Sequence, residues 1–236
     1  MHGKAMRIMA KVDLTALGDN ELCDYLRRES GLPGPRANLT LVDQAAASLP
    51  RRTLSWLADA NDEYLAMCGV AGIARACMSQ ARQTDAELDQ LAGYVRDPRW
   101  RLREGVVRGL QLAAVDNPIA VAELVHSWVR SPDLAVVRAA VEAICEPRLL
   151  KSREMCAVAL DACAVSTTTL SETEGQSRTD QWRGLEQTLS YAWSVAVAAE
   201  PVRGLPMFEA LEAAQSPLVR RIAARNRTKK RLARLL

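Results

Sequence analysis

Long apolar runs, cysteine pairs and histidine clusters are what this 236-residue chain lacks. No window approaches the roughly 18 consecutive apolar residues of a membrane-spanning helix, so such a helix is excluded. Residues 1–11 lack the apolar core of a secretory signal, and we therefore expect a cytoplasmic protein with no membrane partner. With 49% apolar and 25% charged residues, the composition is that of a globular protein rather than a disordered one.

Residues that commonly bind metals or carry acid–base chemistry are also scarce. The two histidines, His2 and His126, are far apart, and the six cysteines show no CxxC pair and no metal-ligand spacing. Each cysteine lies in an apolar, helical-looking stretch, where cysteine is usually a small buried hydrophobic residue. We therefore expect reduced cysteines, no metal site and no cofactor.

Prolines and polar capping residues divide the sequence into segments of helix length. Four prolines directly follow a small polar residue, which is typical of a helix start because proline loses no hydrogen bond at the first helical position. These pairs are Asp97-Pro98, Asn117-Pro118, Ser131-Pro132 and Ser216-Pro217. Between the breaks apolar residues recur at helical spacing and no run alternates as a strand would, so the sequence predicts an all-α fold. The predicted helices are 20–29, 39–48, 51–60, 63–80, 85–95, 98–114, 118–130, 133–145, 151–165, 179–198, 202–214 and 217–233.

A repeat underlies the spacing of these helices. A capped turn, an apolar residue and an arginine recur, and the steps between Arg103, Arg138, Arg183 and Arg220 are 35, 45 and 37 residues. A period of about 40 residues with two helices per repeat is typical of HEAT repeats, which stack into a solenoid with a concave inner face. The recurrent arginine would then tie adjacent turns together through a carboxylate or a carbonyl.

The repeat predicts one domain, residues 1–236, built as a HEAT-repeat α-solenoid of stacked antiparallel helix pairs. Residues 1–80 form less typical N-terminal helices, and residues 81–236 form the HEAT-like repeats. A polar segment, residues 166–178, is predicted to be a loop between two helices of one unit.

Positive charge is concentrated at the C-terminus. Residues 218–236 carry eight cations and no acid, which leaves a charge of −5 on residues 1–217 because the whole chain carries +3. Such a block either contacts an acidic partner, DNA or an acidic protein, or forms a solvated last helix whose cations complement the helix dipole.

Four segments resemble a group of bacterial HEAT-repeat proteins related to the HEAT-like DNA alkylation repair glycosylases. They are DPRWRLREGVVRGLQ (97–111), CEPRLL (145–150), YAWSVA (191–196) and NRTKKRL (226–232). The resemblance covers residues 85–236. It implies the solenoid fold and a DNA-binding concave face.

The resemblance also implies a set of site residues. Glu104 would be the catalytic carboxylate, although the family pattern has Asp there, and Trp100 lies one helical turn before it. Trp100, Arg138 and Trp193 would contact DNA: the aromatic rings and the carboxylate suit a cationic alkylated base and its oxocarbenium-like transition state, and arginine suits a phosphate. The tail would add Arg227, Lys229, Lys230 and Arg231. Without the resemblance, tryptophans in a helical array are more often core residues than functional ones, which favours Trp100 and Trp193 as core residues. Glu104 would then pair with Arg101 or Arg108 on its own helix.

Two functions follow from these features. The first, which the sequence favours, is a non-catalytic binding module that holds a protein or nucleic acid with its concave face or basic tail. The second is a DNA glycosylase that releases alkylated bases.

Overall fold

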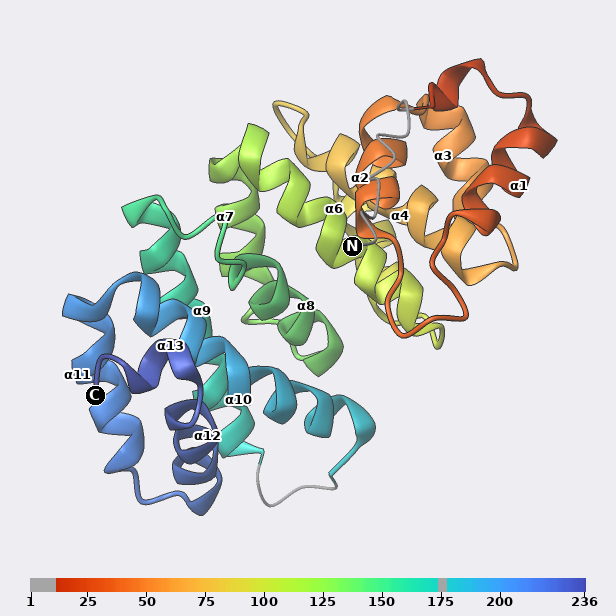
Figure 1. Ribbon diagram of the computed structural model, residues 1–236. Helices are drawn as coiled ribbons and strands as arrows, with labels where there is room; N and C mark the ends of the chain where they lie inside the picture. Colours follow the sequence, from red (N-terminus) through yellow and green to blue (C-terminus); the bar gives the residue numbers. More distant parts are fainter. Residues whose placement is uncertain (1–11, 174–177) are drawn as a thin grey trace, which may run out of the picture.

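Short helices joined by tight turns build the structure, a computed structural model that describes residues 12–173 and 178–236 (Figure 1). These residues form thirteen α-helices, one 3-10 helix and no strand, which confirms the predicted all-α class. No described helix is long and apolar enough to cross a membrane. The elements are η1 (Leu14–Ala16), α1 (Asp19–Arg28), α2 (Leu39–Ser48), α3 (Arg51–Ala58), α4 (Glu63–Met78), α5 (Asp85–Val95), α6 (Trp100–Asp116), α7 (Pro118–Trp128), α8 (Leu134–Ile144), α9 (Arg153–Glu172), α10 (Asp180–Ala199), α11 (Pro201–Glu212), α12 (Pro217–Arg227) and α13 (Lys230–Ala233).

At two of the four prolines that were predicted to begin a helix, the helix begins as expected. The Asn117 side chain accepts the Ala120 N–H at 3.3 Å, and Ser216 accepts the Val219 N–H at 3.3 Å. The following prolines are the first residues of α7 and α12. Each cap satisfies a donor that the helix itself leaves unpaired, which is worth about 1 kcal/mol.

The other two helices begin later than predicted, α6 by two residues and α8 by one, because an aspartate closes the turn. Asp97 accepts the Arg99 N–H at 2.9 Å, and α6 begins only at Trp100. Asp133 caps α8 by accepting the Ala135 N–H at 2.9 Å, a role that the sequence had given to Ser131.

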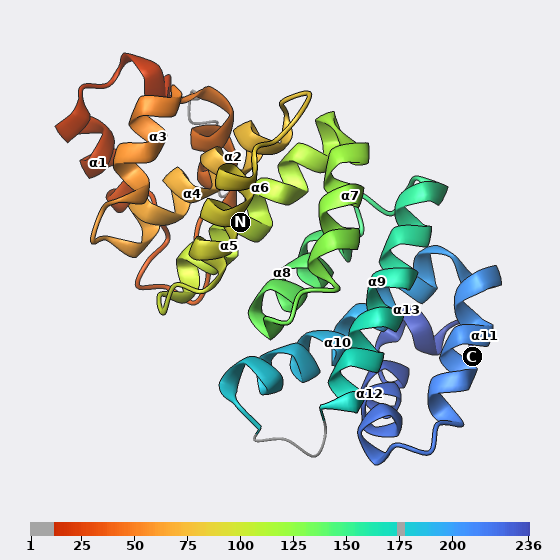
Figure 2. The same cartoon turned by 180° about the vertical axis from the view of Figure 1, so that it is seen from behind.

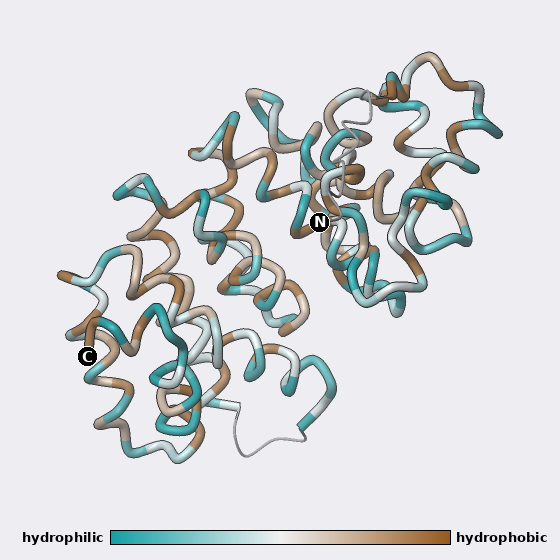
Figure 3. Tube along the Cα trace, viewed as in Figure 1, coloured by the Kyte–Doolittle hydropathy of each residue, from teal (hydrophilic) through white to brown (hydrophobic). Residues whose placement is uncertain are grey.

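Even-numbered helices form a row through the molecule (Figures 1 and 2). α4 packs against α6, α6 against α8, α8 against α10 and α10 against α12, and each odd-numbered helix from α5 to α11 packs beside its neighbours in this row. Along the helices, hydrophobic and hydrophilic stretches alternate, as expected for amphipathic helices (Figure 3). Their apolar faces merge into one core that extends from Leu14 to Leu232.

Two glycines let α6 approach α4 closely. A β-carbon at Gly105 would lie 2.9 Å from the Met67 carbonyl oxygen, and one at Gly109 would overlap the Ala71 carbonyl oxygen. Glycine is unfavourable inside a helix by about 1 kcal/mol, so its presence here reflects the packing rather than helix propensity.

Two of the recurrent arginines make the same contact. Arg103 donates to the carbonyls five and six residues before it, those of Pro98 and Asp97, and Arg220 donates to the carbonyls of Gln215 and Ala214 at the same offsets. Both arginines therefore tie a helix to the turn that precedes it. Arg138 and Arg183 instead pair with carboxylates on their own helices.

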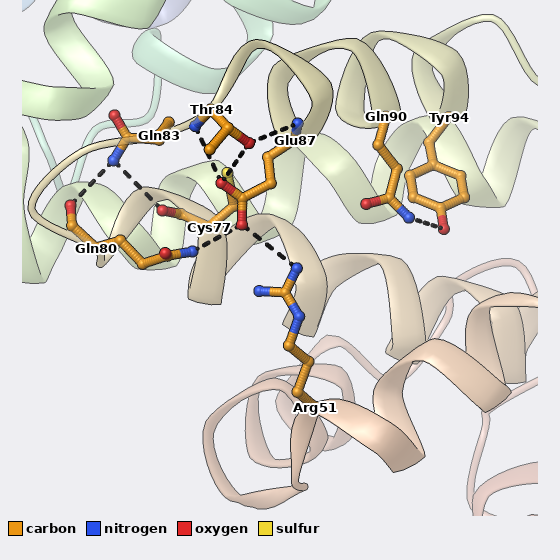
Figure 4. A network of polar contacts seen from close by, with 8 residues as sticks. All are labelled: Arg51, Cys77, Gln80, Gln83, Thr84, Glu87, Gln90 and Tyr94. Carbon is orange, nitrogen blue, oxygen red and sulfur yellow. Dashed lines mark hydrogen bonds and ion pairs between the residues drawn. The ribbon is translucent and has the colours of Figure 1, made fainter.

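A polar network joins α3 to the turn between α4 and α5 (Figure 4). Thr84 and Glu87 cap each other at the start of α5, and the Glu87 carboxylate also accepts from Gln80 at 3.0 Å and from Arg51 of α3 at 3.4 Å. Hydrogen bonds from Thr84 and Gln80 lower the pKa of Glu87 to about 2. This carboxylate thus holds together three elements near the N-terminal end of the row.

The predicted polar loop, residues 166–178, is wrong over its first half, because α9 continues to Glu172. Threonine hydroxyls donate to backbone carbonyls of the preceding helical turn. Thr167 Oγ1 donates to the Cys163 carbonyl at 2.7 Å, and Thr169 Oγ1 donates to the Val165 carbonyl at 3.1 Å. Leu170 is fully buried and anchors the extension. The rest of the predicted loop is short, and residues 174–177 of it lie outside the described part.

The predicted last helix, 217–233, is divided into α12 and α13. α12 ends at Arg227, and α13 begins at Lys230. Asn226 and Leu232 are both fully buried, and α12 and α13 both pack on α10. The basic segment is therefore a packed end of the helix row.

Candidate functional site

A groove of about 560 Å³ lies along the row of even-numbered helices. α6, α8 and α10 supply most of its lining, with Leu39 of α2 at one side. We call it the central groove. Its lining residues are Leu39, Trp100, Arg103, Glu104, Val107, Arg108, Gln111, Arg138, Val141, Glu142, Cys145, Glu146, Gln187, Thr188, Tyr191 and Ala192.

A second hollow, the C-terminal pocket, adjoins the central groove. It has a volume of about 660 Å³ and shares Gln187 and Tyr191 with the groove. Its other lining residues are Ser190, Arg221, Ala224, Arg225, Thr228 and Lys229. The two hollows together form one surface from α6 to α12.

The helical period of α6 determines which of its residues reach the groove. Trp100, Glu104, Val107 and Gln111 recur at spacings of three and four residues and therefore share one face. Leu102, Val106 and Leu110 on the other face are fully buried in the core. The core stripe and the groove stripe are thus two faces of one amphipathic helix.

Trp100, Arg101 and Glu104 form a stack at one end of the groove. Trp100 is 51% exposed, and the guanidinium carbon of Arg101 lies 3.8 Å from the centre of its ring. Arg101 is itself buried and donates to the Glu104 carboxylate at 2.7 Å. The pairing that the sequence allowed for Glu104 therefore exists, and it coexists with a position in the groove.

Arg138 also lines the groove, where Glu142 balances its charge. Its Nε donates to Glu142 Oε1 at 2.8 Å, and the Thr188 hydroxyl of α10 donates to the same oxygen at 2.7 Å. A β-carbon at Gly184 would lie 2.8 Å from Arg138 Nη1, so glycine leaves room for the arginine on α10.

Trp193 does not reach the groove. Only 1% of it is exposed, and its indole N–H donates to Thr167 Oγ1 of α9 at 3.0 Å. It belongs to a core stripe of α10 that includes Trp182, Leu185 and Leu189. The structure therefore brings Trp100, Glu104 and Arg138 to one groove and leaves the fourth expected residue in the core.

Tyr191 is the groove aromatic that sequence reasoning missed. It is 47% exposed and lines both hollows. The signal was present in the sequence, because the apolar stripe of α10 that includes Trp193 leaves Gln187, Thr188 and Tyr191 on the opposite face.

The arginines that line the central groove are held by contacts within the protein. Arg108 donates through Nε and Nη2 to the Asp43 carboxylate of α2, at 2.6 and 2.5 Å. Arg138 pairs with Glu142, and Arg103 is held by backbone carbonyls. Because three arginines and three glutamates line it, the central groove carries no net charge.

The C-terminal pocket, in contrast, is rich in positive charge. Arg221 and Arg225 share one carboxylate, Glu186, at 2.9 and 3.2 Å. The Arg231 guanidinium donates to the Tyr191 hydroxyl at 2.5 Å, and Lys229 lies 5.8 Å from the centre of the Tyr191 ring. Four cations thus surround one carboxylate and one aromatic ring.

The four tail residues expected to bind DNA lie on different sides. Lys229 and Arg231 face Tyr191. Arg227 pairs with Glu212 of α11 at 2.6 Å, and Lys230 makes no contact with Tyr191 among the described interactions. Carboxylates of α10 and α11, Glu186 and Glu212, thus screen some of the tail charge.

The groove contains carboxylates, guanidinium groups and two exposed aromatic rings, a set that can bind anions and stack on planar groups. His126 lies on α7, outside the groove residues. In the described part of the chain, no group of three or more metal-ligating residues could hold a metal ion.

Neither a protein-family model, a curated protein nor a solved structure matches this chain.

Proposed function

We propose that this protein is a non-catalytic HEAT-like binding module that holds nucleic acid along the central groove and the C-terminal pocket. One observation carries the proposal: exposed aromatic rings and a cluster of cations lie on one surface that extends over four helices of the row. Trp100 stands at one end, and Tyr191 stands beside Lys229 and Arg231 at the other.

Aromatic rings and cations are the groups that bind the bases and the phosphates of a nucleic acid, respectively. Stacking of a base on an aromatic side chain is worth about 1–3 kcal/mol and tolerates any sequence. Cations bind phosphates by releasing counterions, which makes affinity depend steeply on salt. The central pairs, such as Arg108 with Asp43, are already neutral, so most of the electrostatic attraction would come from the C-terminal pocket.

We also assign the helix row to a HEAT-like α-solenoid, with α4, α6, α8, α10 and α12 as the inner helices. The consecutive packing of these helices supports this assignment. Arg103 and Arg220 make the same contacts with the turns that precede them. This supports the assignment further, because equivalent residues of successive repeats are expected to make equivalent contacts.

The test compares two triple variants that remove the same charge. One replaces Arg225 and Lys229, which line the pocket, and Arg231, which contacts Tyr191, with Gln. The control replaces Arg227, Lys230 and Arg234, which neither line the pocket nor contact Tyr191 among the described interactions. With labelled single-stranded and duplex oligonucleotides, the first variant should bind more weakly than the control. Its plot of log affinity against log salt should be flatter by roughly 0.9 for each phosphate that it no longer binds.

Equal weakening in both variants would show that the tail acts only through its overall charge. No binding of wild type to any oligonucleotide would contradict the proposal and leave an acidic protein as the partner class to test.

A second candidate is supported by a separate observation: Trp100, Glu104 and Arg138 line the same groove. In a glycosylase that removes alkylated bases, Trp100 would stack on the cationic base, Glu104 would stabilise the oxocarbenium-like sugar, and Arg138 would hold a phosphate. Tyr191 then replaces Trp193 as the second aromatic group.

Base release from alkylated duplex DNA decides between the two functions. In an enzyme, Glu104→Gln should abolish release and leave DNA binding nearly unchanged. Binding of alkylated DNA by wild type without any release would discard the enzyme and retain the binding module.

A further inference from the structure

Cys145 differs from the other cysteines in its environment. All six cysteines lie in the described residues and are free thiols, as the sequence predicts, but Cys145 alone is partly exposed. It lines the central groove, which is open to small molecules in solution. The other five, which are Cys23, Cys68, Cys77, Cys156 and Cys163, are buried.

The Cys145 sulfur lies 3.7 Å from the Cys163 sulfur of α9, close enough for a hydrogen bond between the two thiols. A disulfide bond is about 2.0 Å long, so the sulfurs have to approach by roughly 1.7 Å. Cys145 is the C-terminal cap of α8, with φ −80° and ψ 44°, and it begins the segment that joins α8 to α9. Cys145 is therefore at the end of α8 rather than inside it.

We propose that Cys145 and Cys163 form a modification site, a dithiol that a hydroperoxide converts into a disulfide between α8 and α9. The Cys145 thiolate attacks one peroxide oxygen, and the O–O bond breaks. Cys145 becomes a sulfenic acid, and the released hydroxide takes up the thiol proton and leaves as water. The Cys163 sulfur then attacks the Cys145 sulfur, the S–O bond breaks, and the hydroxyl leaves with the Cys163 proton as a second water. Two thiols are oxidised, and one hydrogen peroxide is reduced to two waters.

The unequal environments of the two thiols set this order. The hydrogen bond with Cys145 and complete burial raise the pKa of the Cys163 thiol, which keeps it protonated and away from the oxidant. Cys145 therefore reacts first, and Cys163 is already in contact with the sulfur that it must attack. This inference does not depend on what the groove binds.

The test exposes reduced, folded protein to increasing hydrogen peroxide, followed by intact mass measurement, thiol counting and peptide mapping. Wild type should lose two thiols and two hydrogens and yield one cross-linked peptide that joins residues 145 and 163. Cys163→Ser should stop at a Cys145 sulfenic acid that a 1,3-dione probe traps. Cys145→Ser should form neither product.

Cys156→Ser is the matched control, since Cys156 is a buried cysteine on the same helix as Cys163. It should form the disulfide as wild type does. A disulfide between any other pair, survival of all six thiols, or accumulation of Cys145 sulfinic acid in wild type without a cross-link would overturn the proposal. Circular dichroism checks that each variant folds. If one serine variant does not fold, the peptide map of the wild-type protein still shows whether residues 145 and 163 are cross-linked.

Discussion

Two aromatic residues of α10, only two positions apart, have opposite environments. Trp193 is enclosed in the core and bonded to Thr167, whereas Tyr191 stands in the groove beside Lys229 and Arg231. The YAWS segment was predicted to place its tryptophan at the site. Only the phase of the apolar stripe, which includes Trp182, Leu185 and Leu189, shows which of the two rings faces inward.

This difference yields a pair of opposite predictions. Trp193→Ala should lower the free energy of unfolding by about 3–5 kcal/mol, because it opens a large core cavity. Tyr191→Ala should change that free energy by less than about 1 kcal/mol. It should weaken nucleic-acid binding by about 1–3 kcal/mol, or roughly 5- to 150-fold, because a base can no longer stack on the ring. Urea unfolding and a binding titration on each variant measure both quantities. If Tyr191→Ala unfolded as easily as Trp193→Ala, its assignment to the groove would be wrong.

Among the elements, α9 shows where sequence interpretation reached its limit. Residues 166–172 are rich in serine and threonine, which disfavour helix interiors when they compete for backbone hydrogen bonds. Here Thr167 and Thr169 bond to carbonyls four residues earlier, so the helix continues. The buried Leu170 is the tertiary contact that outweighs the local preference. In contrast, α2 and α5 have the predicted bounds, because a polar cap begins each of them.

The cap of α5 gives a pH-dependent prediction. The pKa of Glu87 is about 2 in the folded protein and about 4.3 in an unfolded chain. Because folding lowers this pKa, the stabilisation by Glu87 is fully present above about pH 4.3 and is lost as the pH falls toward 2. Glu87→Gln should therefore be less stable than wild type at pH 6, and the difference should shrink steadily on acidification.

Chemical unfolding of both proteins at several pH values measures this difference. Asp89→Asn is the control, since it removes an exposed carboxylate of α5 that makes no contact in the network of Figure 4. If the difference in free energy of unfolding between Glu87→Gln and wild type stayed constant down to pH 2, the charge of the carboxylate would contribute nothing to stability.

At the scale of the whole molecule, the regular spacing of caps and arginines predicted the all-α class and most helix bounds. The family resemblance implied Trp100, Glu104 and Arg138 as one site, and these three residues do line one groove. What the sequence did not reveal is which charges neutralise each other. The pairs Arg108 with Asp43 and Arg221 with Glu186 join residues 65 and 35 positions apart, and only the packing of the helices brings them together.

The basic end of the chain combines two roles that a pair of variants can separate. Asn226 is fully buried between α12 and α10, where it accepts the Ser194 N–H at 2.9 Å and donates to the Leu189 carbonyl at 2.8 Å. Asn226→Ala would leave buried groups unpaired, at a cost of about 1–3 kcal/mol each. For a chain of this size, a destabilisation of about 2 kcal/mol lowers Tm by roughly 4–8 °C.

The cations around the pocket contribute differently, because they lie at the surface, where the substitution of a charge usually changes stability by less than about 0.5 kcal/mol. The Gln triple variant of Arg225, Lys229 and Arg231 should therefore melt close to wild type and bind nucleic acid weakly. Asn226→Ala should melt several degrees lower and, where it is still folded, bind with an unchanged salt dependence. Thermal unfolding by circular dichroism and binding at several salt concentrations, on both variants, test this separation. A triple variant that melts as low as Asn226→Ala would mean that the cations hold the end of the helix row together rather than a polyanion.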